Sequence, residues 1–155
     1  MAISIALERP NFKIFASDIS LDALKIAEIN SRYHKTPITF IKSDWFSEIN
    51  NTFDIIIANP PYISENEYKS LPISIRRFEP KIALTAGISG LDCFKKIIME
   101  FHKYLKPNGI IFIEIGYGQK KIIEELFIKY GYENINFFND LSGKARVVCV
   151  KKDAI

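Results

Sequence analysis

The chain has 155 residues, of which 48% are hydrophobic, 25% charged and 13% aromatic. That length supports one domain with its own core, and the balance of apolar and charged residues argues against intrinsic disorder. The net charge of +3 arises from 21 basic and 18 acidic residues, with the basic pairs scattered. This charge neither requires nor excludes a nucleic-acid partner.

Three absences narrow the class of protein. No apolar run approaches the roughly 18 to 20 residues that cross a bilayer, and Met1 to Leu7 lacks the basic start of a secretion signal. Cys93 and Cys149 stand far apart, without a Cys-x-x-Cys or Cys/His cluster. We therefore expect a cytoplasmic protein with neither a disulfide framework nor a metal site.

Short apolar runs alternate with amphipathic stretches along the chain, which predicts an open α/β sheet with helices on both faces. Ser20 is the expected N-cap of the first of these helices, and Gly131 the expected residue after the last. A turn containing Gly143 joins the last two strands, which should be antiparallel. The expected elements are strand 12–18, helix 20–33, strands 38–41 and 53–58, helix 91–105, strand 110–115, helix 119–130, and strands 135–138 and 146–150.

The run Phe53 to Ala58 is β-branched and has no polar alternation after Asp54, which is typical of a parallel strand buried on both faces. Open α/β sheets bind ligands at the carboxyl ends of their strands. Three expected strand ends carry polar or aromatic residues. The candidate functional residues are therefore Asp18, Asp44–Trp45 and Asn59–Tyr62.

Asn59-Pro60-Pro61-Tyr62 is the most informative of these three groups. Two successive prolines fix the backbone and remove two donors, so the loop should be rigid with free carbonyls. An asparagine oxygen beside a free carbonyl suits a planar NH2 group, and Tyr62 can lie flat against that group. The alternative is a structural Pro-Pro turn with a buried tyrosine.

Each of the other two groups has both a functional and a structural interpretation. Asp18 could accept both hydroxyls of a ribose, or it could only complement the dipole of the helix that follows Ser20. Asp44 could accept from the amine of adenine with Trp45 covering the ring, or the pair could be an ordinary loop.

For two further features the sequence suggests no catalytic or binding role. We expect Arg77 to Pro80, with Ala83-Leu84, to form an ion-paired loop. Glu114, near the end of a buried strand, needs a partner that the sequence does not identify.

Together these residues resemble the release factor glutamine methyltransferases, the HemK-type family of S-adenosylmethionine-dependent enzymes. Asn-Pro-Pro-Tyr alone occurs in several amino-group methyltransferases, but its combination with the segments at 77–84 and 90–92 is more specific. The segments that carry the resemblance are FASDIS at 15–20, SDWF at 43–46, FDIIIANPPYI at 53–63, RFEP at 77–80 with Ala83-Leu84, GLD at 90–92, LKPNGIIFIEIG at 105–116 and RVV at 146–148.

For fold and cofactor, the resemblance implies a Rossmann-like class I methyltransferase sheet, mostly parallel with a C-terminal antiparallel hairpin. It implies S-adenosylmethionine as the cofactor, with Asp18 on the ribose. Asp44 and Trp45 would lie at the adenine. Asn59 would stand between cofactor and substrate.

For substrate, the resemblance implies the glutamine of the GGQ loop in peptide-chain release factors, methylated on its side-chain amide nitrogen. Asn59 and the Pro60 carbonyl would accept the two amide hydrogens. Tyr62 would pack on the amide plane, and Pro61 completes the substrate-binding group. Such a reaction relies on positioning and needs no nucleophilic residue and no metal.

The sequence departs from the family at its start. Members have an N-terminal helical docking domain, then a first strand and a glycine-rich cofactor loop, whereas the first glycine here is Gly87. Met1 to Leu7 resembles the helix after that loop. The resemblance therefore implies that residues 1–155 form a single, partial catalytic domain that lacks the first strand. Strands 12–18 and 53–58 would lose their shared neighbour.

Two alternatives to this function remain open. The chain could methylate an amino group of a nucleic-acid base, because the Asn59–Tyr62 motif suits such substrates too. It could also be a non-catalytic fragment, or a fragment that a second polypeptide complements by supplying the missing strand.

Overall fold

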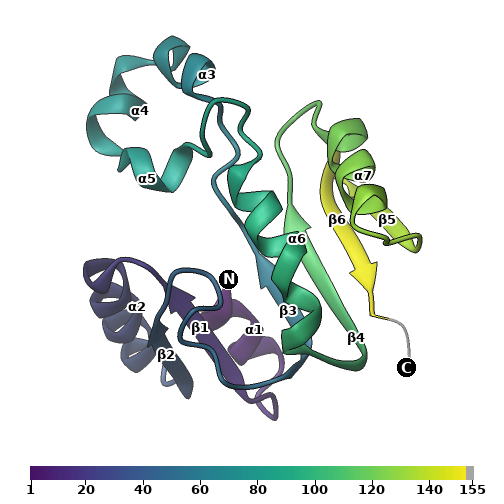
Figure 1. The fold of residues 1–155 in the computed structure, drawn as a ribbon. Helices are drawn as coiled ribbons and strands as arrows, with labels where there is room; N and C mark the ends of the chain where they lie inside the picture. The colour runs from purple at the N-terminus through teal and green to yellow at the C-terminus, as the bar shows by residue number, and fades with distance from the viewer. Residues whose placement is uncertain (153–155) are drawn as a thin grey trace. The chain divides into compact units, whose positions relative to one another are not determined.

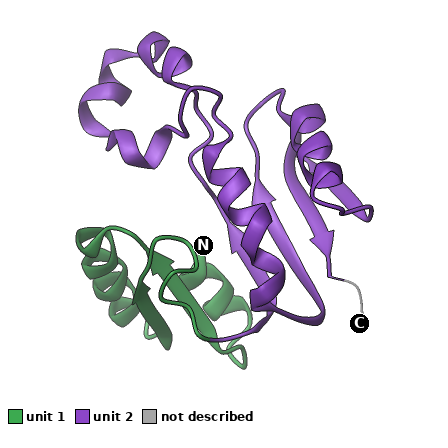
Figure 2. Cartoon of the chain, in the orientation of Figure 1, with its two compact units in different colours: residues 1–50 green, residues 51–155 purple. Residues whose placement is uncertain are grey.

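The computed structural model describes residues 1–152 (Figure 1). The chain divides into two compact units, residues 1–50 and residues 51–155 (Figure 2). Each unit contains a β-sheet of its own, and each sheet includes one parallel pair of strands.

The first unit is a small parallel α/β layer. Its two strands run in register from the pair Ile14 and Ile38 to the pair Asp18 and Lys42. Ser20 caps the second helix as expected, because its Oγ accepts a hydrogen bond of 3.2 Å from the Ala23 amide. The elements are α1 (Ala2–Glu8), β1 (Ile14–Asp18), α2 (Leu21–Tyr33) and β2 (Ile38–Lys42).

The second unit contains a four-stranded sheet in the order β3-β4-β6-β5. β3 and β4 are parallel, and β6 is antiparallel to both of its neighbours, which confirms the C-terminal hairpin. The elements are β3 (Phe53–Ala58), α3 (Glu65–Ser70), α4 (Ile73–Phe78), α5 (Lys81–Leu84), α6 (Asp92–Tyr104), β4 (Leu105–Glu114), α7 (Lys120–Lys129), β5 (Ile135–Asn139) and β6 (Ala145–Lys151).

The main hydrophobic core lies where α6 and α7 pack against this sheet (Figure 1). Alternate residues of β4 point into the core, so Ile111 and Ile113 are fully buried while Phe112 between them is only half-buried. Aromatic rings join the two helices, because Phe101 of α6 contacts both Phe127 of α7 and Tyr132 beyond it. The fully buried side chains are Phe94, Ile97, Ile98, Phe101, Leu105, Ile111, Ile113, Ile115, Ile123, Phe127, Val148 and Val150.

β3 is less buried than its sequence predicts. Ile55 and Ile57 are 46% and 43% exposed, so the expectation of a strand buried on both faces is wrong. The reason is that β3 is an edge strand that pairs only with β4, so its side chains are less enclosed than those of a central strand. β1 ends the other sheet in the same way.

β4 begins earlier than expected. The helix ends at Tyr104, and Leu105 already pairs with Phe53, five residues before the expected start at Ile110. The register shifts further along this ladder, and Asn108 has a left-handed φ of 62°. The Pro-Asn-Gly segment therefore bends a strand instead of separating a helix from one.

The short helices α3 to α5, which follow β3 and precede α6 in the chain, form a lobe of their own that the sequence pattern does not predict (Figure 1). A local signal was present, because Ser64 and Glu67 form a capping box. Ser64 Oγ accepts from the Glu67 amide at 3.2 Å, and Glu67 Oε2 accepts from the Ser64 amide at 2.9 Å. Hydrogen bonds from Ser64 to the carboxylate lower the pKa of Glu67.

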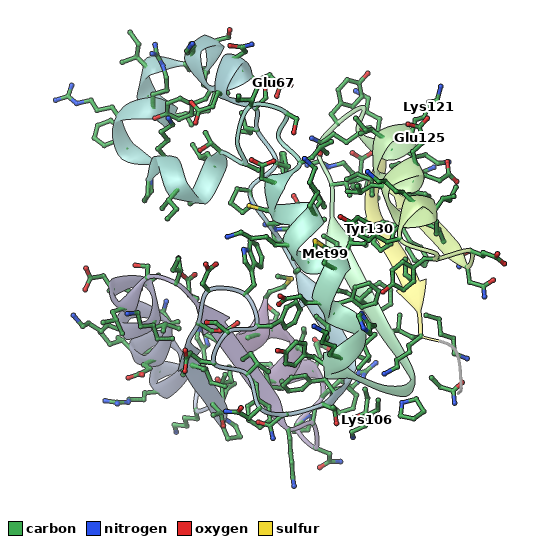
Figure 3. The ribbon with its side chains drawn as sticks, in the orientation of Figure 1. Glu67, Met99, Lys106, Lys121, Glu125 and Tyr130 are labelled. Carbon is green, nitrogen blue, oxygen red and sulfur yellow. The ribbon has the colours of Figure 1, made fainter. Side chains whose placement is uncertain are left out.

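We expect the Phe101→Ala substitution to lower the free energy of unfolding by about 3–5 kcal/mol, because it leaves a cavity between α6 and α7. Met99 lies on the same helix but is 54% exposed (Figure 3), so Met99→Ala should change stability by only about 0.5 kcal/mol. Urea denaturation of both variants measures this difference. Equal losses would mean that α6 does not carry the core.

Candidate functional site

The carboxyl ends of β1 and β2 bring Asp18 and the Asp44–Trp45 loop to one edge of the first unit. The Asp18 carbonyl accepts from the amide of Ser43 at 3.0 Å, which ties the two strand ends together. Asp18 Oδ1 accepts from the Ser20 amide at 2.8 Å, and this bond fixes the orientation of the exposed carboxylate. Asp18 therefore orders the start of α2 and remains accessible to a ligand.

Trp45 occupies a constrained backbone position at the same edge. Its φ of 54° lies in the left-handed region, which is costly for a non-glycine residue. Buried Ser43 holds this turn, because its Oγ donates to the Trp45 carbonyl at 2.9 Å. The indole is half-buried. The hydrogen bond thus fixes the turn at Trp45, and part of the indole ring remains exposed to solvent.

A cavity of about 250 Å³ lies beside Asp18. Residues at the start of the chain line it together with Asp18, Leu24 and Phe40. Pockets for drug-sized ligands measure about 300–1,000 Å³, so this cavity alone would hold only part of a nucleoside cofactor. A carboxylate next to such a space suits a ribose diol, whose two hydroxyls can donate to one carboxylate.

The Asn59–Tyr62 loop leaves the sheet of the second unit directly after β3. Pairing of Ala58 with Ile113 fixes where the strand ends. Asn59 is exposed, Pro60 is buried, and Pro61 and Tyr62 are half-buried. The loop is therefore anchored through its prolines while the amide of Asn59 stays accessible.

Backbone hydrogen bonds hold the residue after this loop on a support segment, which we define as residues 83–90. Ile63 donates its amide to the Leu84 carbonyl at 3.0 Å and accepts from the Ala86 amide at 3.0 Å. This contact is a parallel bridge between Ile63 and Thr85. The Ala83-Leu84 pair, for which the sequence suggested no chemistry, thus has a structural role beside the loop.

Gly90 lets the support segment approach the loop closely. Its φ is 73°, and a Cβ built there would lie 2.6 Å from the Tyr62 carbonyl oxygen. The adjacent Asp92 begins α6 and donates its amide to the Ala86 carbonyl at 3.2 Å. The Gly-Leu-Asp segment therefore joins the support segment to the core helix.

The expectation of an ion-paired loop at 77–84 is wrong. Arg77 and Phe78 end α4, and residues 81–84 form α5, because Pro72 and Pro80 each stand directly before a helix. The stretch is not a loop, but it does form an ion pair, because Lys81 Nζ in α5 lies 2.9 Å from Glu65 Oε2. The Arg77 guanidinium instead lies 5.6 Å from the ring centroid of Phe78.

Glu114, which the sequence left without a partner, pairs with Arg146. Their Oε1 and Nη2 atoms lie 3.6 Å apart, on neighbouring antiparallel strands. The Arg146 guanidinium also lies 6.0 Å from the ring centroid of Tyr62. Because both side chains are about one-third exposed, the pair contributes little to stability. It places a positive charge near the Tyr62 ring, which is a cation–π geometry.

An open hollow of about 580 Å³ adjoins Tyr62. Its walls come from the end of the loop, from α3 and from the turn after β4. Tyr117 stands at its rim and is 72% exposed. The hollow is lined by both apolar and polar side chains.

Comparison with known proteins finds similarity to methyltransferases. Residues 1–74 match the family described as "Methyltransferase small domain". The chain is 38% identical to a release factor glutamine methyltransferase of Lactococcus lactis over 97% of its own length and 56% of that protein. It is 40% identical to a bifunctional methyltransferase of Rickettsia typhi, of which it covers 29%. The chain thus spans about half, or less, of the length of these relatives.

Solved structures agree on the fold. A methyltransferase from Pyrococcus furiosus aligns with a TM-score of 0.69 at 18% identity, covering 97% of this chain and 68% of that one. A Thermus thermophilus 16S rRNA methyltransferase, solved with AdoMet and guanosine, aligns with a TM-score of 0.67 at 16% identity, covering 96% of this chain and 34% of that one. The fold is therefore that of a class I methyltransferase.

The family resemblance of the sequence is also confirmed. Over nearly all its residues the chain is homologous to the release factor glutamine methyltransferases, three of which are 35–38% identical to it.

Two features are absent from the described residues. No helix within 1–152 is long and apolar enough to cross a membrane. The same residues contain no group of three or more His, Cys, Asp or Glu side chains that could hold a metal ion.

The close approach of Gly90 to the loop can be tested against a matched glycine. Gly143 has a similar φ of 77°, but a Cβ placed there would have no heavy atom within 4 Å. Both glycine-to-alanine substitutions should cost about 1–2 kcal/mol for the left-handed backbone. Gly90→Ala should cost a further 1–3 kcal/mol, roughly, because its Cβ overlaps the Tyr62 carbonyl.

Urea denaturation and hydrogen exchange of the Ile63 amide measure both effects. Faster exchange in Gly90→Ala alone is expected. Equal destabilisation of the two variants, with Ile63 protected in both, would contradict the support role of Gly90.

Proposed function

We propose that this chain forms the catalytic part of an S-adenosylmethionine-dependent methyltransferase that modifies the side-chain amide nitrogen of a glutamine in peptide-chain release factors. The observation that carries this proposal is the Asn59–Tyr62 loop, whose prolines are anchored while the Asn59 amide is exposed. The names of three relatives that match along nearly the whole chain support the same substrate.

The proposed chemistry follows from the weak nucleophilicity of an amide. The lone pair of an amide nitrogen is delocalised into its carbonyl, so the nitrogen must be oriented and partly rehybridised before it can attack. The cofactor would supply an electrophilic sulfonium methyl group. The new nitrogen–carbon bond would replace the carbon–sulfur bond, so that the neutral thioether S-adenosylhomocysteine leaves and one amide proton passes to solvent. Asn59 Oδ1 and the Pro60 carbonyl would accept the two amide hydrogens and aim the nitrogen at that methyl. This is catalysis by positioning and preorganised dipoles.

Tyr62 and Pro61 would complete the substrate site. The half-buried Tyr62 ring offers a flat surface on which the glutamine amide plane can pack. Pro61 has no amide hydrogen, so it does not compete with the substrate for the nearby acceptors. The hollow beside Tyr62 would hold the residues that flank the glutamine.

Cofactor binding is proposed for the edge residues of the first unit. The Asp18 carboxylate would accept from the ribose hydroxyls, next to the cavity that it lines. Asp44 would accept from the adenine amine, and Trp45 would cover the ring. Asn59 would contact the cofactor from the substrate side.

The Asn59→Ala substitution should lower the rate of methyl transfer at least about hundredfold, because one of the two acceptors for the amide hydrogens is lost. Asn134→Ala, in an exposed loop before β5, is the matched control and should leave the rate unchanged. The measurement is transfer of labelled methyl groups to a release factor and to a peptide with its GGQ sequence.

The same assay includes DNA and RNA as acceptors. Methyl incorporation into nucleic acid but not into the release factor would replace the proposed substrate by a nucleic-acid base. An unchanged rate in Asn59→Ala would contradict the assigned role of that residue.

Asp18→Asn should weaken S-adenosylmethionine binding by about tenfold or more, because a charge-assisted bond to the ribose is replaced by a neutral one. Asp22→Asn is the control, since Asp22 is exposed and pairs with Lys25 at 2.8 Å one turn along α2. Calorimetric titration measures both affinities. Equal affinities in the two variants would remove Asp18 from the cofactor site.

The titration also tests whether a second polypeptide takes part. β1 ends its sheet, and such an edge can accept an added parallel strand. We propose that an added strand beside β1 completes the cofactor site next to Asp18. Adding the part of the Lactococcus lactis relative that this chain does not match should then tighten cofactor binding. An unchanged affinity would argue against a partner strand.

A further inference from the structure

Gln119 connects the turn after β4 to the loop after β3. Its Nε2 donates to the Tyr62 carbonyl at 3.0 Å, and its Oε1 accepts from the Gly116 amide at 2.8 Å. One side-chain amide thus uses both of its ends to bond two backbone groups that lie far apart in the chain.

The position of Gln119 in the fold makes this arrangement unusual. It is the N-cap residue of α7, yet its side chain makes no capping hydrogen bond. Ser, Thr, Asp and Asn are preferred at N-caps because their short side chains reach the amides of the first helical turn. Gln119 therefore leaves the helix start without a side-chain cap, while its amide group bonds the Tyr62 segment.

Gly116 provides the space for this connection. A Cβ at Gly116 would lie 2.7 Å from Gln119 Oε1 and 2.9 Å from Cδ2 of Tyr62. Backbone, amide and aromatic ring are thus packed in direct contact. Gly116 is buried and Gln119 half-buried, so water competes little for these bonds.

We propose that Gln119 is a positioning residue that fixes the Asn59–Tyr62 loop. Gln119 holds the loop from the turn after β4, whereas the support segment 83–90 holds it from a different part of the chain. The proposal rests on the function assigned to that loop. By holding the Tyr62 carbonyl, Gln119 leaves the Pro60 carbonyl to the substrate and sets the plane of the Tyr62 ring. A displacement of about 1 Å in such a loop can lower a rate about hundredfold.

The substitution Gln119→Ser separates positioning from stability. Serine is a better N-cap than glutamine, and the improved cap should offset much of the stability lost with the two hydrogen bonds, so the melting temperature should change little. Its side chain is too short to reach Tyr62. We expect kcat for a GGQ peptide to fall about tenfold to hundredfold with a KM change below about threefold, and the Ile63 amide to exchange faster. Gln119→Glu keeps the Gly116 acceptor but loses the donor to Tyr62, so it should also lose activity.

Lys121→Ser on the same helix is the control. Lys121 is exposed and lies 4.0 Å from Glu125, and both residues project from α7 (Figure 3). This variant should keep both kcat and the Ile63 protection. Wild-type kcat and unchanged Ile63 exchange in Gln119→Ser would overturn the proposal, as would a loss of activity that only follows a loss of stability. If the unmodified chain transfers no methyl groups, with or without the added part of the Lactococcus lactis relative, the proposed function fails, while exchange at Ile63 still decides the role of Gln119.

Discussion

The parallel pairing of β3 with β4 is the constraint on which the rest of the second unit depends. The register that joins Ala58 to Ile113 makes the two strands end at the same edge. Their following loops must therefore emerge side by side, since parallel neighbours present their carboxyl ends together. Because β4 carries the fully buried Ile111 and Ile113, the position of this edge is fixed by the core. Packing of α6 and α7 thus sets the geometry of a site that neither helix forms by itself.

Much of the fold could be predicted because its signals are local. The Ser20 cap, Gly131 after α7 and the β-branched strand 53–58 all act within a few residues. The exposure of Ile55 and Ile57 could not be predicted, because it depends on whether a further strand lies beside β3. Periodicity reports that a strand is apolar, and does not report how many neighbours the strand has.

The chemistry proposed for the candidate site follows from residue types, whereas the contacts that support the site could not be predicted. Asn59 and the two prolines after it are visible in the sequence. The partner of Glu114 lies far along the chain on an antiparallel strand, and the bonds from Ile63 to the 83–90 segment are made by backbone atoms. Backbone bonds leave no mark on residue type except at glycines. Gly90 was such a mark, but its close approach to the Tyr62 carbonyl requires the tertiary structure.

The two groups of candidate residues are held in different ways, and this has a consequence for their tolerance to change. Asp18 is oriented by an amide two residues away, and Trp45 by a hydroxyl two residues away. The Asn59–Tyr62 loop depends on contacts with Leu84 and Gln119, which are distant in sequence. Substitutions far from the loop in sequence can therefore displace the loop, whereas the edge of the first unit retains its local shape as long as β1 and β2 pair. The position of the Asn59–Tyr62 loop is for this reason the feature of the candidate site most sensitive to the packing of the second unit.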